Sequence, residues 1–353
     1  MAHRSAGHQI SGHPARKQNG HAETVCIAGS GTAQGSRTVA SEDVDRAFGM
    51  TPGKLRRRAG IESLAYVSEG ENELSLGARA AREALRPSGT DAGDLDWIVA
   101  TSETHHDYPS LAAQLHSTLV VRENCAALDI GGGCLGLLNA FVVAQSLVAS
   151  GEAQTVVVIS ADVHSRTLIP GRVAGEFGGL FGDGASAFLL RPARAREESF
   201  ALGKFFFGCA GQYAGAVCVS DDKDGGLTLR FDGDALSRAA ISRMDKVIAA
   251  VELRSGIART EAGAFATHQP NPRLMALVAK QCGLPAALFP EVARLSGNLG
   301  SSTCGTALHL ALQRAAEERQ AKPIFLASLG PGLLFGGGWV ERAERAIERQ
   351  RDL

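Results

Sequence analysis

The sequence predicts an α/β protein whose strands are covered on both faces, and three observations support this prediction. From Thr24 onward, short β-rich apolar runs alternate with longer amphipathic stretches, as strands alternate with helices in α/β folds. Several of the short runs, such as residues 154–162, are apolar almost without a break, which is typical of strands that helices cover on both sides. The order of elements restarts after residue 192, which indicates two pseudo-repeated halves.

The individual elements follow from hydrophobic periodicity. In the first half we expect strands at residues 24–32, 96–102, 125–130, 154–162 and 185–192, and helices at residues 75–86, 111–120 and 137–150. The strand at 125–130 is predicted to be buried. In the second half we expect helices at residues 236–254, 272–283 and 302–318, and strands at residues 263–268, 323–330 and 333–342.

No low-complexity linker separates the two halves, so we expect one compact unit. Residues 1–23 are polar and rich in Gly and His, and we expect them to be a disordered extension. The first half then spans residues 24–192 and the second half spans residues 193–353.

Composition excludes several classes of protein. The chain has 353 residues, of which 44% are hydrophobic and 21% charged, as in a globular enzyme. Its formal charge of -1 gives no overall attraction to nucleic acid or to a membrane surface. Neither a long apolar segment nor a secretory signal is present, so we expect a cytoplasmic protein. Seven cysteines without a CxxC pair argue against disulfides and against a metal site.

The strongest local feature is the stretch LDIGGGCLGLLNAF, residues 128–141. A predicted strand runs into three glycines and then into Cys134, which opens a hydrophobic helix. Unpaired N–H groups and the helix dipole can stabilise a thiolate at such a position. We therefore interpret Cys134 as a nucleophile and the other six cysteines as packing residues.

A nucleophilic cysteine needs a polar partner that the fold brings close. His268 ends a predicted strand and Asn298 lies between glycines just before a predicted helix. Both positions are strand-to-helix junctions, where α/β sheets present catalytic groups. Two alternatives stay open: Asn298 as a helix or turn cap, and His105 or His106 as the base.

Cys134, His268 and Asn298 stand in the segments GGGCLG, THQPNPRLM and SGNLGSS. These segments resemble the Cys-His-Asn triad of the thiolase superfamily, most closely the β-ketoacyl-acyl-carrier-protein synthase III family. The resemblance covers about residues 24–345. Further stretches that match the family are RRRAGIES (56–63), THHDYPSLAAQLHSTL (104–119), SADVHSRT (160–167), FGDGASAFLL (181–190) and LGPGLLFGGGWVER (329–342).

This resemblance implies a five-layered αβαβα thiolase-like fold, a homodimer and a two-stage condensation without a cofactor. Cys134 would take an acyl group from an acyl-CoA or an acyl carrier protein. A malonyl thioester on the carrier protein would then lose CO2, and its carbanion would attack the acyl group. His268 and Asn298 would stabilise the enolate oxygen that forms on decarboxylation. The pathway would be fatty-acid or polyketide biosynthesis.

The resemblance also implies roles for residues around the triad. The N–H groups of Cys134 and Gly336 would form the oxyanion hole. Arg58 and Arg166 would bind the phosphate groups of CoA or phosphopantetheine, which the planar guanidinium suits. Leu137 would line the acyl pocket, and Tyr108 would reach into the acyl pocket of the partner subunit.

Three other functions remain open at this point. The first is an acyltransferase of the same fold that works without decarboxylation. The second is an enzyme of the type III polyketide synthase kind, because GNLGSS and LGPGL also resemble that group. The third is a non-catalytic dimer partner, which the intact triad disfavours.

Overall fold

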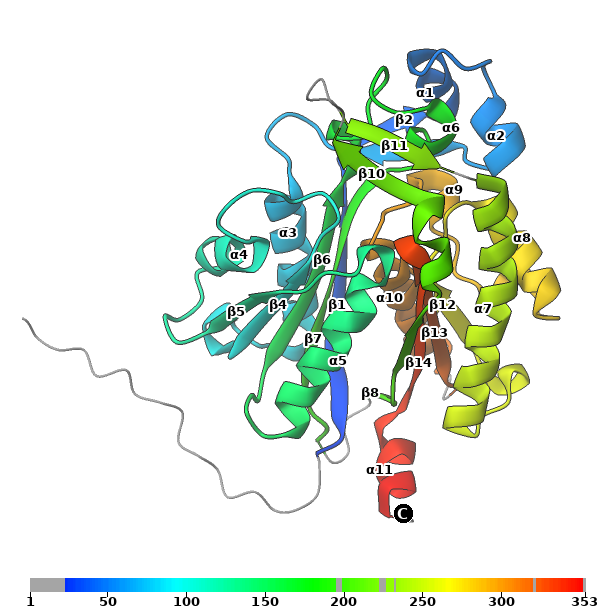
Figure 1. Ribbon diagram of the computed structural model, residues 1–353. Coiled ribbons are helices and arrows are strands. Elements are labelled where there is room, and N and C mark those ends of the chain that lie inside the picture. Colours follow the sequence, from blue (N-terminus) through cyan, green and yellow to red (C-terminus); the bar gives the residue numbers. More distant parts are fainter. Residues whose placement is uncertain (1–22, 195–198, 222–226, 232, 320–321, 352–353) are drawn as a thin grey trace, which may run out of the picture.

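The computed structural model describes residues 23–194, 199–221, 227–231, 233–319 and 322–351 (Figure 1). Apart from Glu23, the predicted N-terminal extension lies outside the described residues. The strands are β1 (Val25–Gln34), β2 (Arg37–Ala40), β3 (Ser63–Tyr66), β4 (Trp97–Thr101), β5 (Ala126–Asp129), β6 (Val156–Val163), β7 (Asp183–Pro192), β8 (Phe200–Leu202), β9 (Phe206–Cys209), β10 (Val217–Asp221), β11 (Leu227–Phe231), β12 (Ala264–Thr267), β13 (Ile324–Gly330) and β14 (Leu334–Arg342).

Helices connect these strands, and none within the described ranges is both long and apolar enough to cross a membrane. The α-helices are α1 (Ser41–Ala47), α2 (Lys54–Ala59), α3 (Glu73–Leu85), α4 (Leu111–Leu119), α5 (Gly136–Ala149), α6 (Gly175–Gly178), α7 (Gly233–Ser255), α8 (Pro272–Gln281), α9 (Ala293–Ser296), α10 (Ser302–Glu317) and α11 (Ala343–Arg351).

A central sheet runs through both halves of the chain in the order β12-β13-β14-β8-β1-β7-β6-β4-β5, with β9 paired to β14. The halves meet where β1 pairs antiparallel with β8. Outward from this junction, β1 is followed by β7, β6 and β4 in the first half. In the second half, β8 is followed by β14, β13 and β12. Strand directions match as well, because β6–β4 and β13–β12 are both parallel while β7–β6 and β14–β13 are both antiparallel.

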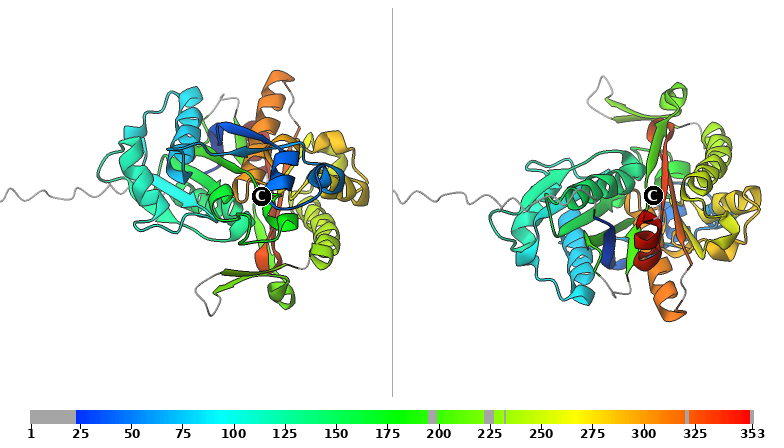
Figure 2. Two further views of the ribbon diagram at one scale, coloured as in Figure 1. Left: turned by 90° about the horizontal axis from the view of Figure 1, so that it is seen from above. Right: turned by 90° about the horizontal axis from the view of Figure 1, so that it is seen from below.

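Helices and sheet halves stack in five layers, α-β-α-β-α. Helices α3 and α4 share an apolar core with one face of the first sheet half. Helices α5 and α10 form the central layer, whose core takes in residues from both sheet halves. Helices α7 and α8 cover the outer face of the second half. Figure 2 shows the two outer helical layers on opposite sides of the molecule.

The long predicted helices are all present, with ends that differ from prediction by at most three residues. Strand positions agree similarly. The sequence reading did not predict the β2–β3 pair with α1 and α2, nor the β10–β11 hairpin. These segments are short and lack the sustained apolar periodicity on which the prediction rests.

The predicted burial of the strand at 125–130 is wrong in the single chain. Strand β5 is the edge of the central sheet, where it pairs with β4 alone. Its residues Ala127, Leu128 and Asp129 are exposed. An apolar run does not show whether a second strand will cover its open edge.

Close packing in the central layer depends on glycine. A Cβ atom added to Gly305 of α10 would lie 2.0 Å from Oγ of Ser186 in β7 and 2.8 Å from Cδ2 of Leu137 in α5. Larger side chains would therefore force the helices of the central layer away from the sheet.

We expect Gly305→Ala to lower the free energy of unfolding by about 1–3 kcal/mol, because the added methyl group overpacks the central layer. The matched control is Gly93→Ala, since an added Cβ there meets no atom within 4 Å. Denaturant unfolding of both variants measures the difference. Equal stability of Gly305→Ala and wild type would contradict the packing described here.

Candidate active site

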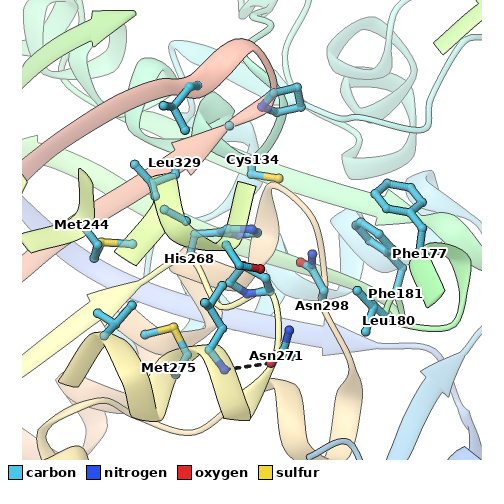
Figure 3. Close-up of a pocket in the computed structure, with 18 of the residues that line it drawn as sticks. Cys134, Phe177, Leu180, Phe181, Met244, His268, Asn271, Met275, Asn298 and Leu329 are labelled. Carbon is cyan, nitrogen blue, oxygen red and sulfur yellow. Dashed lines mark hydrogen bonds between the residues drawn. The ribbon is translucent and has the colours of Figure 1, made fainter. Parts of the chain in front are cut away.

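A cavity between the two halves collects the three residues that the sequence singles out (Figure 3). Cys134 comes from the first half, and His268 and Asn298 come from the second. The rest of the lining is mainly apolar and was not predicted from the sequence. Its apolar residues are Phe177, Leu180, Phe181, Ala240, Met244, Pro270, Leu274, Met275, Val278, Leu329, Pro331 and Leu333.

Cys134 sits on a sharp turn between β5 and α5. The backbone reaches it through Gly132 at φ 141° and Gly133 at φ 55°, a region that residues with a side chain rarely adopt. A Cβ on Gly133 would lie 2.7 Å from Cδ of Pro331, so the β13–β14 turn packs directly on this elbow. The Oγ of Ser328 donates a 2.7 Å hydrogen bond to the carbonyl oxygen of Cys134, which ties the elbow to the second half.

His268 follows β12, and its backbone N–H donates to the carbonyl oxygen of Ala327 at 3.0 Å. The side chain is 4% exposed, and its Nδ1 has no hydrogen-bond partner among the described residues. Burial lowers the pKa of His268 to about 4, against a smaller opposing effect of the Glu103 charge. The imidazole is therefore neutral near pH 7 and offers one donor and one acceptor.

Asn298 is held by its own loop. The Oδ1 atom accepts hydrogen bonds from the backbone N–H of Gly300 at 3.0 Å and from Oγ1 of Thr303 at 3.1 Å. The backbone N–H donates to the carbonyl oxygen of Leu180 at 2.8 Å. The capping role considered for Asn298 is therefore present, and the amide NH2 is left as the donor on the cavity side.

Glu103 is a cavity residue that the sequence reading missed. It follows β4 directly, within the stretch SETHHDYPS, and its side chain is 16% exposed. An oxygen of its carboxylate, Oε2, lies 3.6 Å from Nε2 of His164. A carboxylate placed just after a buried strand was the available signal, because that is where α/β sheets present functional groups.

Burial disfavours the charged forms of the ionisable groups in the cavity, and nearby opposite charges favour them. Burial favours a higher pKa for Glu103, but hydrogen bonding and charge from His164 outweigh it and leave the pKa below its usual value. Burial by itself would lower the pKa of His164, but Glu103 and Asp162 outweigh this effect and raise the pKa to about 8. Near pH 7 the pair is therefore a carboxylate beside an imidazolium.

Contrary to the prediction, the site does not stabilise a Cys134 thiolate. Burial raises the pKa of Cys134 well above its usual value, and the charge of Glu103 raises it further. These effects exceed what the start of α5 contributes. The resting thiol is therefore protonated at neutral pH.

Neither histidine of the alternative pair lines the cavity. The Nε2 of His105 lies 3.2 Å from Nε2 of Gln114, and His106 is exposed. Among the other cysteines, Cys304 is fully buried in the central layer, and the side chain of Cys218 lies outside the described residues.

Gly336 is not among the residues that line the cavity. It lies within β14, opposite Ser328 and Phe207. The turn that does lie on Cys134 is the one between β13 and β14, and Pro331 at its centre has no N–H to donate. Gly336 thus lies outside the cavity of Cys134, contrary to the expectation that its N–H belongs to an oxyanion hole there.

The remaining predicted residues also lie away from the cavity. Leu137 is fully buried in the central core, so it packs the fold and does not line the acyl pocket. Tyr108 is 100% exposed in the single chain. Arg58 in α2 and Arg166 after β6 are exposed, and the guanidinium of Arg166 bonds to the carbonyl oxygen of Glu71.

Comparison with known proteins identifies the family of the chain. Residues 128–211 match the family described as 3-oxoacyl-[acyl-carrier-protein] synthase III, and residues 253–342 match its C-terminal counterpart. The chain is 30% identical to β-ketoacyl-[acyl-carrier-protein] synthase III of Ruegeria sp., over 88% of this chain and 96% of the relative.

Solved structures show the same fold. The 3-oxoacyl-(acyl carrier protein) synthase III of Pseudomonas aeruginosa superposes with a TM-score of 0.79 at 23% identity, over 90% of this chain and 98% of that one. OleA of Xanthomonas campestris superposes with a TM-score of 0.80 at 18% identity, over 91% and 99%. The chain belongs to the β-ketoacyl-acyl-carrier-protein synthase III family of the thiolase superfamily, and it is a condensing enzyme of the acyltransferase class.

Proposed function

We propose that this enzyme joins an acyl group carried on Cys134 to a malonyl thioester, with loss of CO2. The observation that carries the proposal is the convergence of a thiol, a neutral imidazole and an amide donor on one apolar cavity. Fatty-acid or polyketide biosynthesis is the setting that such a condensation serves. The reaction needs no cofactor beyond its thioester substrates.

In the first stage the sulfur of Cys134 attacks the thioester carbonyl of an acyl-CoA or an acyl carrier protein. The carbonyl oxygen becomes an oxyanion, which N–H groups of the protein can stabilise. We assign one donor to the N–H of Cys134 and place the second in the β13–β14 turn instead of at Gly336. The donor thiol then leaves and the acyl group remains on sulfur.

In the second stage the malonyl thioester takes the place of the departed donor. Its C–C bond to the carboxylate breaks, CO2 leaves, and the electron pair becomes an enolate. His268 and Asn298 donate hydrogen bonds to the enolate oxygen, whose charge appears only in this step. The enolate carbon attacks the acyl-sulfur carbonyl, and Cys134 departs as the new C–C bond closes.

The apolar wall of the cavity is suited to an acyl chain. Met244 and Ala240 from α7 and Met275 and Val278 from α8 line it on one side. Flexible methionines adapt readily to an alkyl chain. Arg58 and Arg166 are proposed to meet the phosphate groups of CoA or of the carrier's phosphopantetheine at the protein surface.

We also propose that the enzyme is a cytoplasmic homodimer that works with an acyl carrier protein, without nucleic acid or a membrane. Strand β5 has an open edge and exposes Leu128, and an open edge is a place for a second copy to pair. Tyr108 is fully exposed in one chain, so it does not line the cavity of its own subunit and could only enter that of a partner.

Glu103 favours one second candidate, acyl transfer to a hydroxyl or amine without decarboxylation. Its fixed negative charge repels the malonyl carboxylate, and it can accept a proton from such a nucleophile. Release of CO2 from malonyl carrier protein separates the two functions, because only the condensation produces it.

Incubation with a panel of acyl-CoAs and acyl carrier proteins should place one acyl group on Cys134, visible as a mass increase of the intact protein. Cys134→Ala should acquire none, because it lacks the nucleophile. Cys304→Ala is the matched control and should acylate like wild type, since Cys304 is buried away from the cavity. Absence of an adduct on wild type with every donor would contradict the proposed function.

His268→Ala and Asn298→Ala should keep most of the Cys134 acylation but lose CO2 release by about 100-fold or more, because each removes a donor to the enolate oxygen. Since the pKa of His268 is about 4, its neutral form persists above pH 6. Decarboxylation by wild type should therefore not rise between pH 6 and 8 through titration of this residue. Radiolabelled malonyl carrier protein provides the measurement.

Ala240→Phe should shorten the acyl chain that the enzyme accepts, because the added ring occupies the cavity beside α7. Each methylene that no longer fits costs about 1–3 kcal/mol, so the longest donors should lose at least about tenfold in kcat/KM relative to acetyl. Ala249→Phe is the matched control, on the exposed face of the same helix. An unchanged chain-length profile in Ala240→Phe would place the acyl group elsewhere.

A further inference from the structure

Glu103 lies in the cavity without a role in the condensation described above. Its side chain and that of Cys134 line the same cavity, and its charge raises the pKa of the Cys134 thiol. The Oε1 atom of Glu103 is buried and has no partner with ordinary hydrogen-bond geometry among the described residues. One carboxylate oxygen, Oε2, thus lies 3.6 Å from the His164 ring, while Oε1 has no partner in the described part of the chain.

The position of Glu103 is built into the fold. Its backbone N–H donates a 2.5 Å hydrogen bond to Oδ1 of Asp162. Asp162 is in turn fixed by the backbone N–H and the hydroxyl of Ser301, at 2.7 Å and 2.6 Å. Asp162 of β6 therefore fixes the backbone of Glu103, and the loop before α10 fixes Asp162.

The titratable groups that face Glu103 are Cys134 from the start of α5, Asp162 and His164 from the end of β6, and His268 from the end of β12. His164 is the one cation among them near neutral pH. Glu103 is therefore ionised and paired, while the thiol beside it keeps its proton.

Acylation requires this thiol proton to leave. As sulfur bonds to the thioester carbon, the S–H group becomes far more acidic, and an adjacent base can take the proton in the transition state. The imidazole of His268 is the other base in the cavity, but its stated task is donation to the enolate in the later stage. The unpartnered oxygen of Glu103 is free for the first stage.

We propose that Glu103 is a catalytic residue that takes the proton of Cys134 during acylation and returns it to the departing thiol. The S–H bond of Cys134 breaks as its S–C bond to the acyl group forms, and the proton moves to the Glu103 carboxylate. When the tetrahedral intermediate collapses, the C–S bond to the donor breaks and its thiolate takes the proton from Glu103. No charge or proton is gained overall, and the proposal rests on the acyl transfer described under the proposed function.

The Glu103→Gln variant tests the proposal, because loss of a base and loss of a mere negative charge change the acylation rate in opposite directions. Loss of the base should slow the single-turnover acylation of Cys134 by about 100-fold or more at pH 7. If Glu103 acted through its charge alone, the same variant would acylate faster, because removal of the negative charge lowers the pKa of the thiol. Rapid quenching and intact mass measure the rate with the best acyl-CoA from the panel.

The pH profile gives a second signature. Without the base, attack needs a preformed thiolate, so acylation by Glu103→Gln should rise about tenfold per pH unit between pH 6 and 9. Wild type should rise far less steeply than tenfold per pH unit, because Glu103 is ionised throughout and only its partner His164, with a pKa of about 8, titrates beside it. Glu103→Asp should recover part of the rate. A wild-type rate that itself rises tenfold per pH unit would overturn the proposal without recourse to any variant.

Glu261→Gln is the matched control, because Glu261 is exposed near the start of β12, at the opposite end of that strand from His268. It should acylate like wild type. If wild type acylates and Glu103→Gln is equally fast or faster, the proton-transfer role is wrong while the proposed function stands. If wild type acylates with no donor, the proposed function itself fails.

Discussion

The contact between the β13–β14 turn and the Cys134 elbow holds the active site together. Ser328 binds the carbonyl oxygen of Cys134, and Pro331 lies where any side chain on Gly133 would stand. The nucleophile belongs to one half of the chain and its two polar partners belong to the other. Without this contact the continuous central sheet would still join the halves, but it would not set the distance between the sulfur of Cys134 and the side chains of His268 and Asn298.

Burial leaves two groups of the site neutral, while two others stay ionised as a pair. The thiol of Cys134 and the imidazole of His268 are both kept neutral because burial outweighs the nearby groups that favour their ionisation. Glu103 and His164 are both ionised because each compensates the other. In the proposed mechanism, the neutral groups meet developing charge and the one fixed carboxylate moves a proton.

Periodicity predicted the long helices and the inner strands because each must bury one face along its whole length. It failed where burial depends on a neighbour. Strand β5 was predicted to be buried and is an edge, and Leu137 was assigned to the acyl pocket although it packs the central core. Gly336 was expected beside the sulfur and lies within β14 outside the cavity, since a run of glycines does not show which of them the partner strands enclose.

The sequence by itself determined the α/β class, the two-part order and the three residues Cys134, His268 and Asn298, because polar residues in turns just before helices form a local pattern. The tertiary structure alone decided which groups surround them. Glu103 lines the same cavity as the thiol, and burial together with this charge raises the pKa of Cys134 instead of lowering it, through the packing of segments far apart in the chain. Electrostatic energy depends on distances in space and on the exclusion of water, and the order of residues alone specifies neither of them.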